Sequence, residues 1–276
     1  MVAPGVRRGR RARTLPGVRL AVSGILFDLD GTLLDTSGPI GRSWTTWAVE
    51  HDVSAEDFAR VGSHGRRSVD LVETLVPPDR VGSALARIHE LELADLDGIV
   101  QIPGAGDLLR ALPVDRWGIV TSGDRRLATA RLLASDLAFA VDRLLVTGEE
   151  VPAGKPDPAP YLAGAAALGL PAADCLVVED APAGIASGLA AGSRTLAVTT
   201  TVPRTELRRA DAVVTDLCAV RVLSVGTGIV LETTAGPHPG DRSESVTQQA
   251  QQAPQAPHPE PAQRPEQAQQ SRGARP

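Results

Sequence analysis

The chain has 276 residues, with a formal net charge of -5 and an isoelectric point near 5.6, which gives no reason to expect nucleic acid as a partner. Hydrophobic residues make up 42% of the chain but aromatic residues only 3%, so the core must consist mainly of Ala, Val, Leu and Ile, as suits an α/β fold. Its two cysteines are too few for a disulfide framework at this length and fit a reducing cytoplasm.

Residues 1–20 are rich in arginine and poor in apolar residues, which predicts a basic, flexible N-terminal arm. The arm lacks the apolar stretch that a secretory signal peptide needs. No segment of the chain approaches the roughly 18 to 20 consecutive apolar residues of a membrane span. We therefore expect a cytoplasmic protein with no membrane partner.

An apolar run over residues 21–27 predicts the first strand, buried on both faces because the run barely alternates. The strand leads directly into two carboxylates, Asp28 and Asp30, followed by Gly31. Side chains two residues apart in extended chain point to the same side, so both carboxylates can face one small volume, where they need a cation or a shared proton. Mg²⁺ with a substrate phosphate meets that need, and one carboxylate can then attack the phosphoryl group while the other moves protons. The alternative is a solvated acidic turn.

Residues 37–102 show helical periodicity, with helices predicted over 40–50, 55–61, 68–76 and 80–96. We expect these residues to form an all-helical insertion. A polar, glycine-bounded loop lies between two of its helices, and His64 and Arg66 in this loop are candidates for reading substrate hydroxyls or phosphate. A solvated helix N-terminus would have the same composition.

Strands and helices alternate after residue 103. Strands are predicted over 117–120, 144–146, 175–178, 195–198 and 212–214, and helices over 105–111, 127–134, 161–168 and 185–191. This alternation favours an α/β class fold with a Rossmann-like, doubly wound parallel sheet, built from residues 21–36 and 103–230. Ligands of such sheets bind beyond the carboxyl ends of the strands.

Polar side chains follow the predicted strands at that edge. Thr121 and Ser122 offer donors to phosphoryl oxygens, and Asp180 adds a carboxylate to an acidic metal site. Lys155 is the only lysine among 28 basic residues, and it supplies a compact charge for Asp28 and the phosphate. Taken singly, Thr121 could be a helix N-cap and Asp180 part of a capping pair. Their coincidence at one edge favours a site.

From residue 231 the composition changes to Gln, Pro, Ala, Ser and Arg. Few large apolar residues remain, so this part of the chain cannot bury a core of its own. We expect residues 231–276 to form a disordered tail.

Four segments resemble, in order, the signatures of the haloacid dehalogenase-like hydrolase superfamily: residues 27–36, 119–123, 154–158 and 177–184. The resemblance covers roughly residues 23–216. The helical insertion over residues 37–102 is similar to the small α-helical cap of subfamily I. The segments 64–66, 103–105 and 178–185 resemble the branch of sugar and polyol phosphatases that act on hexitol, 2-deoxyglucose 6- and glycerol 3-phosphates.

The resemblance implies that Asp28 is a nucleophile that forms an aspartyl-phosphate. It implies that Asp30 protonates the leaving alcohol and then activates water. Mg²⁺ would be held by Asp28, the backbone carbonyl of Asp30, and Asp180, with Glu179 nearby through water. The residues that would hold phosphoryl oxygens are Thr121, Ser122 and Lys155, and those that would select the sugar are His64 and Arg66.

The expected function is therefore Mg²⁺-dependent hydrolysis of a small sugar or polyol phosphate by a monomer. A β-phosphoglucomutase-like mutase stays open, because it uses the same two aspartates. A non-catalytic binding protein would be expected to have lost one of the residues Asp28, Asp30, Lys155 and Asp180, all of which are present.

Overall fold

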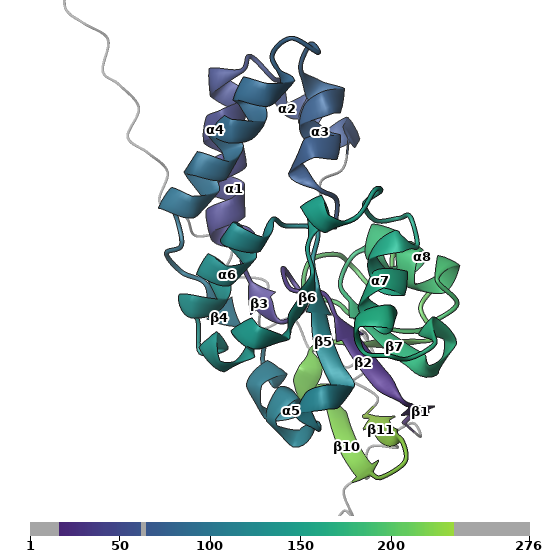
Figure 1. The fold of residues 1–276 in the computed structure, drawn as a ribbon. Helices are drawn as coiled ribbons and strands as arrows, with labels where there is room; N and C mark the ends of the chain where they lie inside the picture. The colour runs from purple at the N-terminus through teal and green to yellow at the C-terminus, as the bar shows by residue number, and fades with distance from the viewer. Residues whose placement is uncertain (1–16, 62–64, 235–276) are drawn as a thin grey trace, which may run out of the picture. The chain divides into compact units, whose positions relative to one another are not determined.

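The computed structural model describes residues 17–61 and 65–234 and contains a six-stranded parallel sheet (Figure 1). The strand order is β6-β5-β2-β7-β8-β9, and every neighbouring pair is parallel. The strands are β2 (Gly24–Phe27), β5 (Trp117–Val120), β6 (Leu144–Val146), β7 (Cys175–Glu179), β8 (Arg194–Val198) and β9 (Ala212–Val214). The chain winds outward from β2 in both directions, which confirms the predicted Rossmann-like, doubly wound sheet.

Helices cover both faces of this sheet, which is why its central strands are continuously apolar. They are α5 (Ala105–Ala111), α6 (Arg125–Leu133), α7 (Ala159–Ala167) and α8 (Pro182–Ala190). Ile25 and Phe27 of β2 pack in one cluster with residues of α5 and α6, whereas Leu26 packs with Tyr161 of α7 on the other face. Figure 1 shows α5 and α6 on one side of the sheet and α7 and α8 on the other.

Four helices form a separate group between two short strands. They are α1 (Ser37–Glu50), α2 (Ala55–Val61), α3 (Ser68–Leu75) and α4 (Val81–Ala94), and they lie between β3 (Leu34–Asp35) and β4 (Val100–Gln101), which pair antiparallel. Trp47, Val72 and Ile88 are fully buried in a cluster of their own. The Trp47 indole also donates to the carbonyl of Ala84 at 2.7 Å. This group, drawn at the top of Figure 1, lies within residues 37–102, where four helices were predicted.

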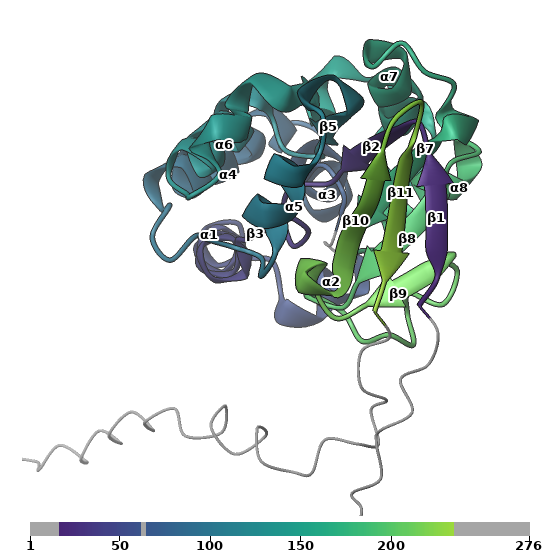
Figure 2. The ribbon, with the colours of Figure 1, turned by 90° about the horizontal axis from the view of Figure 1, so that it is seen from below.

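Both ends of the described chain differ from the prediction. The strand predicted over 21–27 is two strands, and the first, β1 (Arg19–Val22), belongs to a second, antiparallel sheet with β11 (Ile229–Thr233) and β10 (Val220–Val225). Figure 2 shows these three strands side by side. β9 is therefore not the last strand. The predicted boundary between arm and core, at residues 20/21, falls within β1, and the predicted boundary between core and tail, at residues 230/231, falls within β11. Buried residues alternate with exposed ones in β1 and with partly buried ones in β11, the pattern of a half-buried sheet.

None of the helices within the described residues has the length and apolar composition that crossing a membrane requires.

Candidate active site

Asp28 directly follows β2, and its amide extends the ladder by donating to the carbonyl of Val178 at 3.0 Å. The chain then turns tightly at Gly31, where φ is 86°, a left-handed conformation that favours glycine. A Cβ atom at Gly31 would lie 2.3 Å from Oδ2 of Asp180. The turn therefore needs glycine both for its backbone and for the approach of Asp180.

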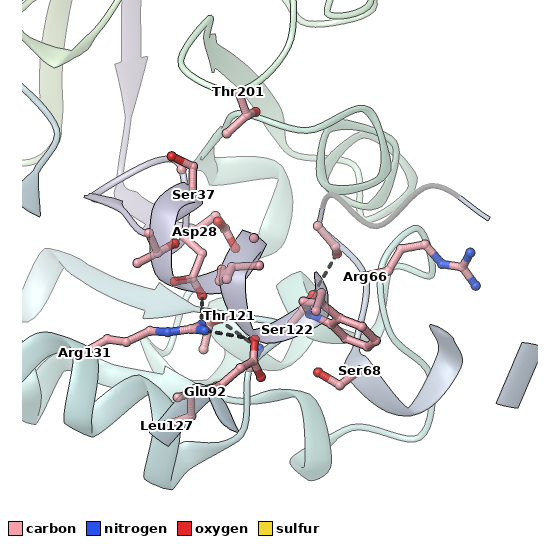
Figure 3. Close-up of a pocket in the computed structure, with 18 of the residues that line it drawn as sticks. Asp28, Ser37, Arg66, Ser68, Glu92, Thr121, Ser122, Leu127, Arg131 and Thr201 are labelled. Carbon is pink, nitrogen blue, oxygen red and sulfur yellow. Dashed lines mark hydrogen bonds and ion pairs between the residues drawn. The ribbon is translucent and has the colours of Figure 1, made fainter. Parts of the chain in front are cut away.

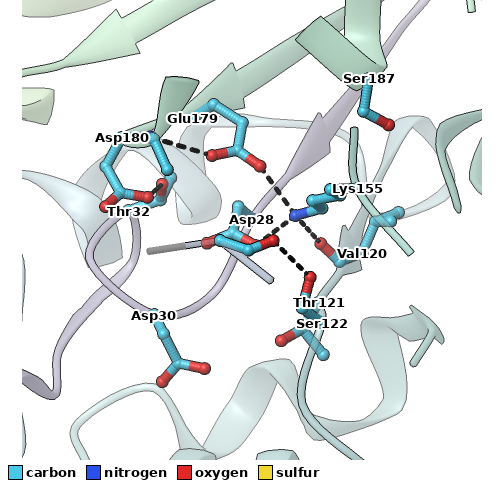
Figure 4. A network of polar contacts seen from close by, with 12 residues as sticks. Asp28, Asp30, Thr32, Val120, Thr121, Ser122, Lys155, Glu179, Asp180 and Ser187 are labelled. Carbon is cyan, nitrogen blue, oxygen red and sulfur yellow. Dashed lines mark hydrogen bonds and ion pairs between the residues drawn. The ribbon is translucent and has the colours of Figure 1, made fainter. Parts of the chain in front are cut away.

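Lys155 lies at the centre of a buried polar network (Figure 4). Its Nζ atom donates to Oδ1 of Asp28 at 2.5 Å, to Oε1 of Glu179 at 2.7 Å and to the carbonyl of Val120 at 3.2 Å. Burial lowers the pKa of Lys155, but the carboxylates of Asp28 and Glu179 outweigh burial and hold this pKa above its usual range. Lys155 is therefore a fixed positive charge.

Three buried carboxylates, those of Asp28, Glu179 and Asp180, offer oxygen atoms that all lie within 4.8 Å of one another. Burial, together with the charges of the neighbouring carboxylates, raises the pKa of Asp28 and raises the pKa of Asp180 to about 7. Lys155 balances one of the three negative charges. The cluster therefore fits a hard divalent cation such as Mg²⁺, which prefers carboxylate oxygens.

Two threonine hydroxyls orient Asp180. Thr32 donates to Oδ1 at 3.1 Å, and Thr201 donates to Oδ2 at 2.5 Å. Thr32 belongs to the acidic motif of the sequence, whereas Thr201 was not singled out there.

Glu179 has partners at both of its carboxylate oxygens. Oε1 accepts from Lys155 and, at 2.7 Å, from the hydroxyl of Tyr161; Oε2 accepts from the amides of Asp180 at 3.1 Å and Ala181 at 3.3 Å. A Cβ atom at Gly184 would lie 1.7 Å from Oε1, so the glycine makes room for this side chain. Glu179 thus holds Lys155 in place in the structure.

Asp30 lies apart from the network around Lys155, as Figure 4 shows, and its carboxyl is not part of the three-carboxylate cluster. Its Oδ2 atom accepts from Nη1 of Arg131 at 2.8 Å, while Oδ1 is buried and has no hydrogen-bond partner among the described residues. Asp28 and Asp30 nevertheless line the same cavity, of about 260 Å³. The two carboxyls therefore face one volume, as predicted, with different partners.

Thr121 and Ser122 follow β5 and line that cavity. Thr121 is buried, and its Oγ1 accepts from the amide of Gly123 at 3.1 Å. The hydroxyl of Ser122 donates to the carbonyl of Gly65 at 2.8 Å, which joins the core to the loop before α3. The structure therefore brings both residues to the site, with the Ser122 hydroxyl already engaged.

The two candidate residues of the polar loop are not equally described. His64 lies outside the described residues. Arg66 lines the cavity, but Nη1 donates to the carbonyl of Val61 at 3.1 Å, and Figure 3 shows the guanidinium directed away from Asp28.

Sequence reasoning missed two charged residues of the cavity, Arg131 of α6 and Glu92 of α4 (Figure 3). Nη2 of Arg131 donates to Oε1 of Glu92 at 3.2 Å. A signal was available, because Glu92 continues the buried row of Ala84 and Ile88 at a spacing of four residues. A charged side chain on the apolar face of a helix indicates a buried partner.

Residues 22–192 match the family model of the haloacid dehalogenase-like hydrolases. Hexitol phosphatase A of Escherichia coli (strain K12) is 36% identical over 213 residues, which are 75% of this chain and 97% of that protein. 2-Deoxyglucose-6-phosphate phosphatase 2 of Saccharomyces cerevisiae is 33% identical over 230 residues, which are 75% of this chain and 93% of that protein.

Solved structures agree with this match. A hydrolase from Pseudomonas syringae superposes with a TM-score of 0.64 at 26% identity, over 71% of this chain and 94% of that one. A β-phosphoglucomutase from Clostridium difficile shares the fold, with a TM-score of 0.60 at 19% identity, over 71% of this chain and 92% of that one. The chain belongs to the haloacid dehalogenase-like hydrolases.

Proposed function

We propose that this protein hydrolyses the phosphate monoester of a small sugar or polyol in a Mg²⁺-dependent reaction. The observation that carries the proposal is the contact between Lys155 and Asp28, made at the carboxyl edge of the sheet beside Asp180 and a cavity of about 260 Å³. The relatives named as hexitol and 2-deoxyglucose-6-phosphate phosphatases support both the reaction class, phosphoric monoester hydrolysis, and the substrate class.

Asp28 is the proposed nucleophile. A carboxylate oxygen of Asp28 forms a bond to phosphorus while the bond from phosphorus to the ester oxygen breaks, which gives an aspartyl-phosphate. The positive charge of Lys155 and the hydroxyl of Thr121 stabilise the negative charge that develops on the phosphoryl oxygens. The hydroxyl of Ser122 would join them by leaving the carbonyl of Gly65. Mg²⁺, held by Asp28, Asp180 and the backbone carbonyl of Asp30 with Glu179 behind them, would neutralise the phosphate and the buried carboxylates.

Asp30 is the proposed general acid and base. Its buried Oδ1 atom has no hydrogen-bond partner among the described residues, so it is available to the ester oxygen. Asp30 gives a proton to the leaving alcohol and then takes one from the water that attacks the aspartyl-phosphate. The hydrogen bond from Arg131 to Oδ2 holds the carboxyl of Asp30 in position during both proton transfers.

The helical insertion over residues 37–102 is the proposed cap that binds the leaving alcohol. It contributes Trp44 and Phe58 to the cavity, whose apolar faces suit the C–H faces of a carbon chain or sugar ring, and Ser37 and Ser68 beside them. Arg66, and His64 outside the described residues, stay candidates for sugar selection. The cytoplasmic location and the monomeric state also stay predictions, and most of the predicted arm (1–20) and of the predicted tail (231–276) lies outside the described residues.

The test is phosphate release, with Mg²⁺ and with EDTA, from hexitol phosphates, 2-deoxyglucose 6-phosphate, glycerol 1- and 3-phosphates and β-glucose 1-phosphate. We expect release that needs Mg²⁺ and favours a few of these esters. Conversion of β-glucose 1-phosphate to the 6-phosphate without release would make the protein a mutase. If no ester is turned over, the proposal is overturned and a non-catalytic binding protein is the remaining interpretation.

A further inference from the structure

Two carboxyl groups share the guanidinium of Arg131, a side chain that is only 4% exposed. Nη1 donates to Oδ2 of Asp30 at 2.8 Å, and Nη2 donates to Oε1 of Glu92 at 3.2 Å. Asp30 belongs to the turn after β2, Arg131 to α6 of the core, and Glu92 to α4 of the helical insertion. One side chain therefore joins Asp30, the proposed acid and base, to the insertion; Figure 3 shows the contact of Arg131 with Glu92.

One carboxylate oxygen of Glu92 accepts no hydrogen bond from the described residues. Its side chain is 4% exposed and lines the same cavity as Asp28 and Asp30, and Oε2 is buried without a hydrogen-bond partner among the described residues. A buried acceptor without a donor is unfavourable. By contrast, both carboxylate oxygens of Asp180 and of Glu179 accept hydrogen bonds. Oε2 of Glu92 is therefore placed to accept a hydrogen bond from a ligand bound in the cavity.

The surroundings of Glu92 define the donor that would fit. The insertion walls the cavity with apolar side chains, among them Ile40, Trp44 and Leu71, which cannot accept a hydrogen bond. The hydroxyls of Ser37 and Ser68 also line the cavity, but Oε2 of Glu92 is the buried carboxylate oxygen of the insertion that has no hydrogen-bond partner among the described residues. A hydroxyl is a neutral donor that fits between a carboxylate oxygen and an apolar wall.

We propose that Glu92 accepts a hydrogen bond from a hydroxyl group of the leaving alcohol while Asp30 protonates the ester oxygen of the same molecule. This inference rests on the proposed phosphatase function and narrows its substrates. Because both carboxyls bind one guanidinium, the hydroxyl must lie on a carbon close to the ester carbon. The site should therefore favour polyol and sugar phosphates over simple alkyl phosphates. An alkyl phosphate has no hydroxyl to donate to Glu92 and would leave this carboxyl buried without a donor.

The test compares two esters of equal chain length, glycerol 1-phosphate and propyl phosphate, which lacks the free hydroxyls. At pH 8, above the pKa of about 7 that burial gives Glu92, we expect wild-type kcat/KM to favour the glycerol ester by about tenfold to hundredfold, the range for a hydrogen bond to a charged group. In Glu92→Ala the two esters should have nearly equal kcat/KM values. The change should come from a lower kcat/KM for the glycerol ester, with the value for propyl phosphate unchanged. Glu90→Ala is the matched control, because Glu90 lies on the same helix with a side chain that is 70% exposed.

Each outcome separates the inference from the function on which it rests. Hydrolysis of both esters with the same preference in wild type and Glu92→Ala, or with no preference in wild type, overturns the role of Glu92 and leaves the phosphatase. Absence of hydrolysis of any ester by wild type overturns both. If Glu92→Ala lacks a cooperative thermal transition, Glu92→Gln replaces it, with a reduced preference expected.

Discussion

Nζ of Lys155 lies 2.5 Å from Oδ1 of Asp28, and neither group is open to solvent. The two residues are 127 positions apart in the chain, and they meet because both follow strands of one parallel sheet. Nζ also donates to Glu179 and to the carbonyl of Val120, so all three ammonium protons are used. A compact ammonium matches this arrangement, and a planar guanidinium does not.

Lys155→Arg should therefore impair turnover despite keeping the charge. The larger, planar group must displace Asp28 from its position, and a displacement of about 1 Å can lower kcat about a hundredfold. Steady-state kinetics on the best ester of the panel measures the effect. The control is Arg208→Lys, the reverse exchange at an exposed position, and near-normal kinetics of Lys155→Arg would contradict the argument.

Asp28→Asn should abolish turnover and keep the fold. The amide has nearly the same shape but is not a nucleophile, so we expect kcat to fall by more than about a thousandfold. Lys155 keeps Glu179 as its partner, and one buried negative charge disappears, so the melting temperature should not fall. Thermal unfolding and phosphate release are measured on the same preparation. Asp136→Asn, at an exposed position, is the control.

The sequence was sufficient for the parallel sheet because its strands are uninterrupted apolar runs that end in polar residues. It was insufficient for β1, β10 and β11, which each carry a charged residue within the strand and pair across a large separation in the chain: Arg19 lies opposite Glu232. Local patterns carry no information about such a pairing.

The candidate site shows the same division. Asp28 and Asp180 stand at strand ends, and Lys155 follows a strand across a loop and is the only lysine of the chain, so all three were found from the sequence. The contact between Arg131 and Glu92 depends instead on how the insertion packs on the core. The hydrogen bonds of Glu179 to Lys155 and Tyr161 were equally invisible, because they follow from side-chain direction in the folded state.

Gly31→Ala should inactivate the protein. φ at Gly31 is 86°, which costs an alanine about 1–2 kcal/mol, and the added Cβ would also overlap Asp180 Oδ2 at 2.3 Å. Gly98→Ala separates the two effects, because Gly98 has a φ of 81° but no atom within 4 Å of the added Cβ. Melting temperature should fall in both variants, and kcat only in Gly31→Ala. Equal kcat values would show that Asp180 tolerates the displacement.

Stability should depend on pH through Glu92. Burial raises the pKa of Glu92 to about 7, with Arg131 of α6 opposing burial and the carboxylates of Asp30 and Asp124 adding to it; His89 of α4 lies 3.4 Å from Asp124. The ordinary pKa of a glutamate is 4.5. The folded state therefore binds this proton more tightly than the unfolded state does.

This difference in proton affinity decides the direction in which stability changes with pH. Below about pH 4.5 both states are protonated and the contribution of Glu92 to stability is complete; as the pH rises toward about 7 the unfolded state ionises first, and the contribution is lost. We expect the free energy of unfolding of wild type, relative to Glu92→Gln, to fall by roughly 2 to 3 kcal/mol between pH 5 and pH 8. Urea unfolding in EDTA at both pH values measures this difference without contributions from bound metal. A difference that does not change with pH would mean that Glu92 is already ionised at pH 5, with Arg131 outweighing burial.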